Sequence, residues 1–409
     1  MRASPAESDF AVAEMQGLDG AFTFAEKLLQ KIWLRGDFDH AAAATTDGRR
    51  VRILHPGKWN LLGGPDFTAA RLRMGDDAPH DVIGDVEIHL HASDWDAHGH
   101  ATDPAYANVA LHVVLFPPEA GRLTRGASGR VIPVLALLPL LHRALEEFAA
   151  DEAVESLANR PLSRAVEALG QLQPAELTAL LGRHATARWR QKVHFARLRL
   201  QRLGWDAACH HTALEILGYR FNRAPMLRLA GAHPLSQWAV SAVTPESAYA
   251  AEEKGWSLQG VRPANHPRAR LRQYAAWAAA RPEWPARLLF LGASLPTIDP
   301  APGARENTRA IRRAQKFPAL RQEIAADICG VTIGGTRLET LLCDGFLPLL
   351  AAQTSRDYRG LWHHWFAGDL PPAIAGSLRA LGYFDGKAHP ACHGSAQGLL
   401  GWLIENEAK

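Results

Sequence analysis

Apolar residues follow two different spacings along the chain, and the change between them divides it into two parts. Over residues 22–35 they recur at helical spacing, which predicts a first helix. Short apolar or alternating runs follow, separated by turn residues such as Asp47-Gly48, and these runs predict strands. The runs are VRILHPG, FTAARLRMG, DVEIHLH, NVALHVVLF and RVIPVLALL.

The second part begins near Leu138, where the apolar residues recur every three or four positions. Proline and glycine interrupt this pattern repeatedly, which predicts about ten helices and no sheet of consequence. The fold class is therefore α+β. We expect a flexible tail over residues 1–20, an α/β domain with a mixed sheet over residues 21–140, and a helical domain over residues 141–409.

The run DVEIHLH (residues 85–91) carries an unusual set of polar residues. Side chains alternate between the two faces of a strand, so its valine, isoleucine and leucine point towards one side. The residues expected on the opposite face are Asp85, Glu87, His89 and His91. Four ionisable groups on one strand face are costly to bury unless they bind something, so this face is the candidate functional site.

A second acid, Asp66, stands at the start of the preceding strand, behind Gly63-Gly64-Pro65. Pro65-Asp66, the spacer 67–86 and then Glu87-Ile88-His89 resemble the signature of PD-(D/E)XK nucleases, with histidine where lysine is usual. The resemblance implies an αβββαβ core in which the two acids lie on adjacent strands and bind Mg²⁺ or Mn²⁺ through oxygen ligands. Nucleases of the very-short-patch-repair type, in the same superfamily, also use histidine.

The same resemblance assigns further roles. Asp66, Glu87 and His89 would be catalytic, with His89 positioning or activating a metal-bound water. In many such nucleases an acid on the first helix completes the metal site, and Glu26 is the candidate here. A solvated helix surface is the alternative for Glu26 and is slightly favoured.

The loop HGHATDPAY (residues 98–106) suggests a different metal site. His98, His100 and Asp103 could join His89 and His91 to bind zinc, because histidine and aspartate are both zinc ligands. The spacing is not diagnostic, however. Loop hydrogen bonding, or orientation of the Asp66 and Glu87 carboxylates, is the favoured role. His112, on the strand NVALHVVLF, is interpreted as a structural histidine.

Basic residues crowd one predicted helix, GRHATARWRQKVHFARLRLQRLG, which contains no acid. Contact with the phosphates of a nucleic acid would use Arg188, Arg190, Lys192 and Arg197. The favoured interpretation is an amphipathic helix whose arginines are solvated or paired with acids elsewhere. The net charge of +3 does not by itself indicate a nucleic-acid partner.

The chain as a whole resembles the bacterial family called domain of unknown function 2851. The matching segments are EKLLQKIW, TTDGRRVRILHPGKWNLLGGPDFTAARL, GDVEIHLHASDWDAHGHATDPAYANVALHVV, LGYRFNRAPMLRLA and GVRPANHPRARLRQYA, and the central stretch is long and specific. The resemblance implies little about activity. It includes one departure: family members often carry a cysteine-containing tail after a segment like ACHGSAQGLL, whereas Cys392 stands alone here, so a cysteine metal site at that end is not expected.

Composition and motifs limit the cellular compartments and the classes of enzyme that fit this sequence. No window offers a membrane-spanning run, and the first residues do not look like a signal peptide. The four scattered cysteines fit a reducing cytoplasm. Phosphate-binding loops and a serine-hydrolase elbow are absent from the sequence. A metal-dependent nuclease is thus the leading hypothesis. A non-catalytic binding module on a nuclease-like fold and a zinc hydrolase are the alternatives.

Overall fold

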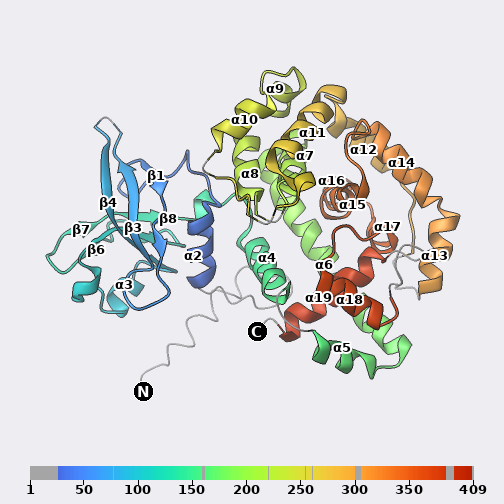
Figure 1. Ribbon diagram of the computed structural model, residues 1–409, viewed down its shortest axis with the longest axis horizontal. Coiled ribbons are helices and arrows are strands. Elements are labelled where there is room, and N and C mark those ends of the chain that lie inside the picture. Colours follow the sequence, from blue (N-terminus) through green and yellow to red (C-terminus); the bar gives the residue numbers. More distant parts are fainter. Residues whose placement is uncertain are drawn as a thin grey trace. The chain divides into compact units, whose positions relative to one another are not determined.

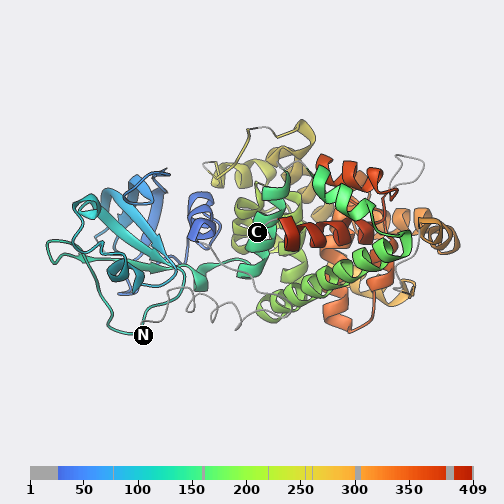
Figure 2. The same cartoon turned by 90° about the horizontal axis from the view of Figure 1, so that it is seen from below.

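The structure, a computed structural model, describes residues 26–407 except 77, 159–161, 220, 254, 260, 300–304 and 384–390. The described chain divides into two compact units, the first ending at Ala149 and the second beginning at Ala150. The fold is α+β, with a mixed six-stranded sheet and helices in the first unit and a largely helical second unit (Figures 1 and 2). The tail expected at residues 1–20 lies outside the described residues.

The first unit begins with a helix that is followed by strands, as the apolar pattern predicts. Its elements are α2 (Glu26–Arg35), β1 (Val51–His55), β2 (Lys58–Trp59), β3 (Phe67–Met74), β4 (His80–His89), α3 (Asp94–Ala97), η1 (Pro104–Tyr106), β5 (Val109–Val114), β6 (Thr124–Arg125), β7 (Val131–Ile132), β8 (Val134–Ala136) and η2 (Leu138–Leu140).

The main sheet changes from antiparallel to parallel at β4. Its order is β1-β3-β4-β5-β8, with β2 also paired to β3. Strands β1, β3 and β4 are antiparallel neighbours, whereas β4 with β5 and β5 with β8 are parallel pairs. Two adjacent parallel strands cannot be joined by a tight turn. Residues 90–108, which include α3 and η1, therefore form a crossover between β4 and β5.

Each face of the sheet has its own apolar cluster. Helix α2 buries Leu28, Leu29, Ile32 and Trp33 in the larger cluster, which includes Val86 and Ile88 of β4. A smaller cluster joins Trp95 of the crossover to Val109 and Ile132. Glu87 and His89 alternate with Val86 and Ile88, so the strand presents them away from the α2 cluster.

The second unit consists of more and shorter helices than the sequence pattern suggests. Its described elements are α4 (Leu145–Ala158, which contains the unit boundary), α5 (Ser163–Gly170), α6 (Pro174–Leu203), α7 (Trp205–Leu217), α8 (Arg223–Ala232), α9 (Leu235–Ala239), α10 (Pro245–Ala251), η3 (Pro263–Asn265), α11 (Pro267–Ala280), α12 (Trp284–Ser294), α13 (Arg305–Ala314), α14 (Phe317–Asp327), α15 (Gly335–Thr340), η4 (Leu341–Phe346, a π-helix), α16 (Leu347–Thr354), α17 (Arg359–His364), α18 (Pro372–Ala380) and α19 (His393–Glu407).

Helix α6 is the longest of these elements, with 30 residues. It places Trp189 in the apolar core of the second unit, against the ring of Trp362 at a centroid distance of 5.3 Å. Among the described residues, no helix is both long enough and apolar enough to cross a membrane.

Close packing at Gly84 fixes how β4 and β5 pair, and it provides a test of the fold. A Cβ at Gly84 would lie 2.6 Å from the Cβ of Ala110 and 2.8 Å from the carbonyl oxygen of Asn108. Gly84→Ala should therefore destabilise the protein by about 1–3 kcal/mol, the usual cost of overpacking. Gly63→Ala is the control, because a Cβ there meets nothing within 4 Å. Urea unfolding of both variants measures the difference, and equal midpoints would contradict this packing.

Candidate functional site

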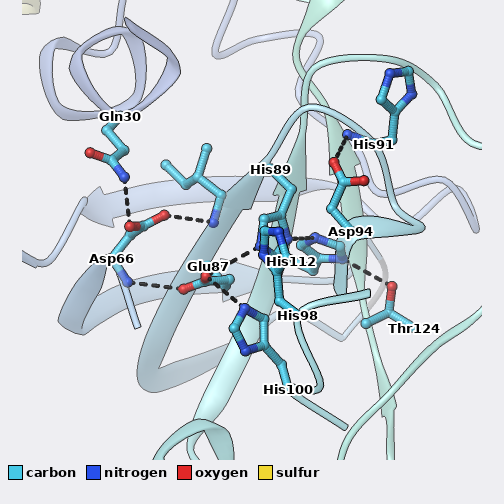
Figure 3. A network of polar contacts seen from close by, with 11 residues as sticks. Gln30, Asp66, Glu87, His89, His91, Asp94, His98, His100, His112 and Thr124 are labelled. Atoms are coloured by element: carbon cyan, nitrogen blue, oxygen red, sulfur yellow. Dashed lines mark hydrogen bonds and ion pairs between the residues drawn. The ribbon is translucent and has the colours of Figure 1, made fainter. Parts of the chain in front are cut away.

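Asp66 and Glu87 meet at the junction of β3 and β4. The backbone N–H of Asp66 donates to Oε2 of Glu87 at 3.0 Å, and the backbone N–H of Ile88 donates to Oδ2 of Asp66 at 3.0 Å. This exchange is possible because β3 and β4 are antiparallel neighbours, with Phe67 opposite Val86. The two acids expected to share a site are thus brought together (Figure 3).

Helix α2 holds the Asp66 side of the site. The side-chain amide of Gln30 donates to Oδ1 of Asp66 at 2.6 Å, while the indole N–H of Trp59 donates to the amide oxygen of Gln30 at 3.1 Å. Glu26, one helical turn before Gln30, is near enough for its charge to raise the pKa of both Asp66 and Glu87. The structure therefore gathers three acids here.

The other oxygen of Glu87 faces a group of histidines. Its Oε1 lies 3.4 Å from Nε2 of His89 and 3.4 Å from Nε2 of His100. Nδ1 of His98 lies 3.1 Å from Nε2 of His89. One ring nitrogen from each of the three histidines lies within 4.8 Å of the others. We call Glu87, His89, His98 and His100 the histidine–glutamate group.

These separations match the edges of a metal coordination shell. Zinc bonds to nitrogen and oxygen of about 2.0–2.1 Å place the ligand atoms of a tetrahedron about 3.3–3.4 Å apart. The Glu87 contacts are at that value, and the contact between His98 and His89 is slightly shorter. Glu87, His89 and His100 are buried, whereas His98 is exposed, so the group opens to solvent on the His98 side.

The crossover places His98 and His100 on the sheet through its own backbone. The N–H of His98 donates to the carbonyl of Asp94, and the N–H of His100 donates to that of Trp95. Gly99 lies between them with a φ of 76°, a left-handed conformation that glycine adopts without strain. The rings of Trp95 and Tyr106 pack on the imidazole of His100.

A chain of hydrogen bonds fixes the ring of His89 from behind. Its Nδ1 lies 2.9 Å from Nε2 of His112, and Nδ1 of His112 lies 3.0 Å from the hydroxyl of Thr124. If protons on Nδ1 of both rings donate towards Thr124, Nε2 of His89 keeps its lone pair. This tautomer is the one that a metal ligand needs. His112 is thus fully hydrogen-bonded, as expected for a structural histidine.

Burial drives the ionisable groups towards their neutral forms. It raises the pKa of Glu87 to about 8, with the charge of Asp66 adding to the effect. Burial also raises the pKa of Asp66 to about 7, and Glu26 contributes. Burial and the neighbouring imidazoles lower the pKa of His89 to about 2. His89 is therefore neutral at physiological pH, and its contact with Glu87 is not an ion pair.

Three sequence candidates lie outside this arrangement. Asp85 accepts the backbone N–H of Ala69, at an irregularity in the pairing of β3 with β4. His91 follows the last residue of β4, and its ring stacks on Phe116 instead of joining the face of Glu87. The alternation expected over residues 85–91 is wrong at His91 because the strand ends first. Asp103 accepts the N–H of Ala105 as the cap of η1.

The basic helix α6 uses two of its four candidate phosphate-binding residues internally. Arg188 is half-buried and donates to the side-chain oxygen of Gln397 at 2.7 Å, and Nζ of Lys192 lies 2.8 Å from Asp344. Arg190 and Arg197 are exposed. Contact with a nucleic acid remains a prediction, and within the described helix only these two of the four are placed for it.

Comparison with known proteins gives one match. A family model described as "Protein of unknown function (DUF2851)" covers residues 26–251, which include all the residues of the site. No curated protein and no solved structure matches the chain at a significant level, so these comparisons do not support the likeness to PD-(D/E)XK nucleases.

The raised pKa of Glu87 predicts how stability depends on pH in the absence of metal. Between its ordinary value of 4.5 and about 8, folded Glu87 keeps a proton that the unfolded chain has lost. The free energy of unfolding should therefore fall as the pH rises through this window. Glu87→Gln removes the ionisation but keeps an acceptor for the N–H of Asp66. In EDTA it should raise the melting temperature at pH 8 and change it little at pH 4. A variant that is less stable than the wild type at pH 8 would contradict the direction of this shift.

Proposed function

We propose that this chain, which belongs to the DUF2851 family, is a metal-dependent hydrolase of phosphodiester bonds in nucleic acid. The observation that carries the proposal is the position of Glu87. One of its oxygens accepts the backbone N–H of Asp66, whose carboxylate charge also acts on it, and the other lies 3.4 Å from His89 and His100. An acid that is buried between a second acid and neutral imidazoles is in surroundings that favour a divalent cation.

The donor atoms decide which ion fits. The histidine–glutamate group offers three imidazole nitrogens and a carboxylate, which suit Zn²⁺ or Mn²⁺ better than Mg²⁺. The acids Asp66, Glu87 and Glu26 offer oxygens, which suit Mg²⁺ or Mn²⁺. We assign the metal to the histidine–glutamate group, because its three imidazole nitrogens lie within 4.8 Å of one another and both contacts of Glu87 have the separation of a coordination-shell edge.

The choice of a phosphodiester substrate rests on likeness in sequence and in element order. The Pro65-Asp66 and Glu87-Ile88-His89 pair is similar to the PD-(D/E)XK signature, and helix, strands, short helix and strand follow one another in the first unit. A bound divalent ion would polarise a phosphate oxygen and lower the pKa of a bound water.

The pKa shifts of His89 and Asp66 indicate which of the two is the metal ligand and which is the base. When water attacks phosphorus, one ester P–O bond breaks and the proton of the water must pass to a base. His89 holds a proton poorly, so we assign it to the metal as a neutral ligand. Asp66, with a pKa of about 7, is the better base near neutral pH. The leaving oxygen then takes a proton from solvent.

The sequence-based scheme is a second candidate within the same chemistry. In it, Asp66 and Glu87 bind Mg²⁺ with Glu26, and His89 positions the water. The closeness of the three acid charges favours it. The two schemes differ in the effect of removing His98, which takes part only in the first.

Cleavage assays test the proposal. Single-stranded, double-stranded and structured DNA and RNA are incubated with the wild type and Mg²⁺, Mn²⁺ or Zn²⁺. Glu87→Ala should abolish cleavage, and Asp66→Asn should lower the rate about 10²–10⁴-fold, the usual worth of a general base, while leaving metal affinity largely intact. His89→Ala and His98→Ala should weaken metal binding, measured by calorimetry. His80→Ala is the control, because this exposed histidine lies at the other end of β4.

Two results would count against the proposal. Cleavage that survives Glu87→Ala would place the activity elsewhere. No cleavage by the wild type with any of the ions, together with no binding of a divalent ion, would favour a non-catalytic binding module on this fold. Unchanged metal affinity in His98→Ala, with loss of affinity in Asp66→Asn, would select the Mg²⁺ scheme.

A further inference from the structure

A second group of metal-ligating side chains lies in the helical unit. Cys392, His363 and His364 each offer a ligand atom, and these atoms lie within 4.8 Å of one another. All three residues are buried, with His364 at 0% exposure. The group shares no residue with the site around Glu87, and it is independent of the proposed hydrolase activity.

The backbone brings the three residues together by pairing two segments that are distant in sequence. His363 and His364 end helix α17, and Cys392 immediately precedes α19. Phe366 forms an antiparallel bridge with Cys392, and the N–H of His393 donates to the carbonyl of Trp365 at 2.9 Å. The Arg312 guanidinium reinforces the pairing, since it donates to the carbonyls of His364, Trp365 and Ala391.

Close packing holds the ring of His363 in this place. A Cβ at position 394 would lie 2.0 Å from Nδ1 of His363, so only glycine leaves room for the ring. The glycine in the first turn of α19 therefore allows the ring of His363 to pack directly against the helix backbone.

One polar atom of the group lacks a partner. Nδ1 of His364 lies 3.0 Å from the hydroxyl of Thr308, which leaves Nε2 as the remaining ring nitrogen. This Nε2 is buried and has no hydrogen-bond partner among the described residues. A buried polar atom without a partner is costly, so its retention calls for an explanation.

The cysteine is suited to metal binding by its surroundings. The Cys392 thiol donates to the carbonyl of His363. A metal ion binds the thiolate form, so binding would release the proton that this thiol donates to the carbonyl. Burial argues against a role as a nucleophile, because Cys392 is only 7% exposed and a substrate would have little access to the sulfur.

We propose that Cys392, His363 and His364 bind a zinc ion in the helical unit. Thiolate and imidazole are both zinc ligands, and the thiolate makes the group softer than the histidine–glutamate group. The ion would give Nε2 of His364 a partner. It would also tie the end of α17 to the start of α19, so its binding free energy would add to the stability of this unit.

Cobalt substitution of the full-length protein tests the proposal. Metal is removed with a chelator and replaced with Co²⁺, and the absorption spectrum is recorded. A thiolate bound to Co²⁺ gives an intense charge-transfer band in the near ultraviolet, which nitrogen and oxygen ligands alone do not give. The wild type should show this band, and Zn²⁺ should displace it. Adding Zn²⁺ to the metal-free protein should raise its melting temperature.

Variants identify the ligands. Cys392→Ser should lose the band, and His364→Gln should weaken Co²⁺ binding while keeping the thiol. Cys209→Ser is the matched control, because Cys209 is also fully buried in this unit but belongs to neither group. Glu87→Ala should keep the band, which separates this site from the proposed hydrolase.

The outcomes are decisive even if a variant fails to fold. Absence of the band in cobalt-loaded wild type would overturn the proposal without any variant. A band that persists in Cys392→Ser would also overturn it, since another cysteine would then be the ligand. A band that is lost in Cys392→Ser and kept in Cys209→Ser would support it.

Discussion

The parallel pairing of β4 with β5 is the constraint on which the candidate site depends. Parallel neighbours need a crossover, and here residues 90–108 provide it in a short span that contains α3 and η1. Its backbone hydrogen bonds place His98 and His100 beside Glu87. The same pairing aligns Glu87 with His112, which puts the imidazole of His112 behind that of His89. A hairpin between these strands would have brought none of these contacts.

Burial shifts the pKa values of the acids and histidines at this site towards their neutral forms. The acids are pushed towards protonation and the histidines towards loss of their protons, because burial penalises every isolated charge. In the metal-free protein the raised carboxyl pKa values cost stability at neutral pH, whereas the lowered pKa of His89 costs stability only below its ordinary value of 6.5. A divalent cation would stabilise the ionised carboxylates and so lower their pKa values. It would also bind an imidazole in the neutral form that burial favours. This is the physical reason for proposing a metal at Glu87 over a purely structural hydrogen-bond network.

Local patterns in the sequence predict the elements of the fold but not the contacts between distant elements. Helical spacing predicts α2 and the helical second part, and the apolar runs predict β1, β3, β4, β5, β7 and β8 but not the short strands β2 and β6. The acid pair Asp66 and Glu87 follows from its position on neighbouring strands. His91 was misplaced because alternation holds only while the strand continues, and β4 ends at His89. His98 and His100 lie in a loop, as the sequence predicts, but residue spacing does not predict the path that this crossover takes over the sheet.

In the helical unit, too, the sequence does not predict which distant residues come into contact. The arginines of α6 look available in sequence, yet Arg188 bonds to a residue of α19 and Lys192 to one of η4, far along the chain. Cys392 looks isolated, yet the bridge between Phe366 and Cys392 sets it beside two histidines of α17. In both cases the partner is supplied by tertiary pairing. A residue that stands alone in the sequence is therefore weak evidence against a site, because its partners can come from segments that are distant along the chain.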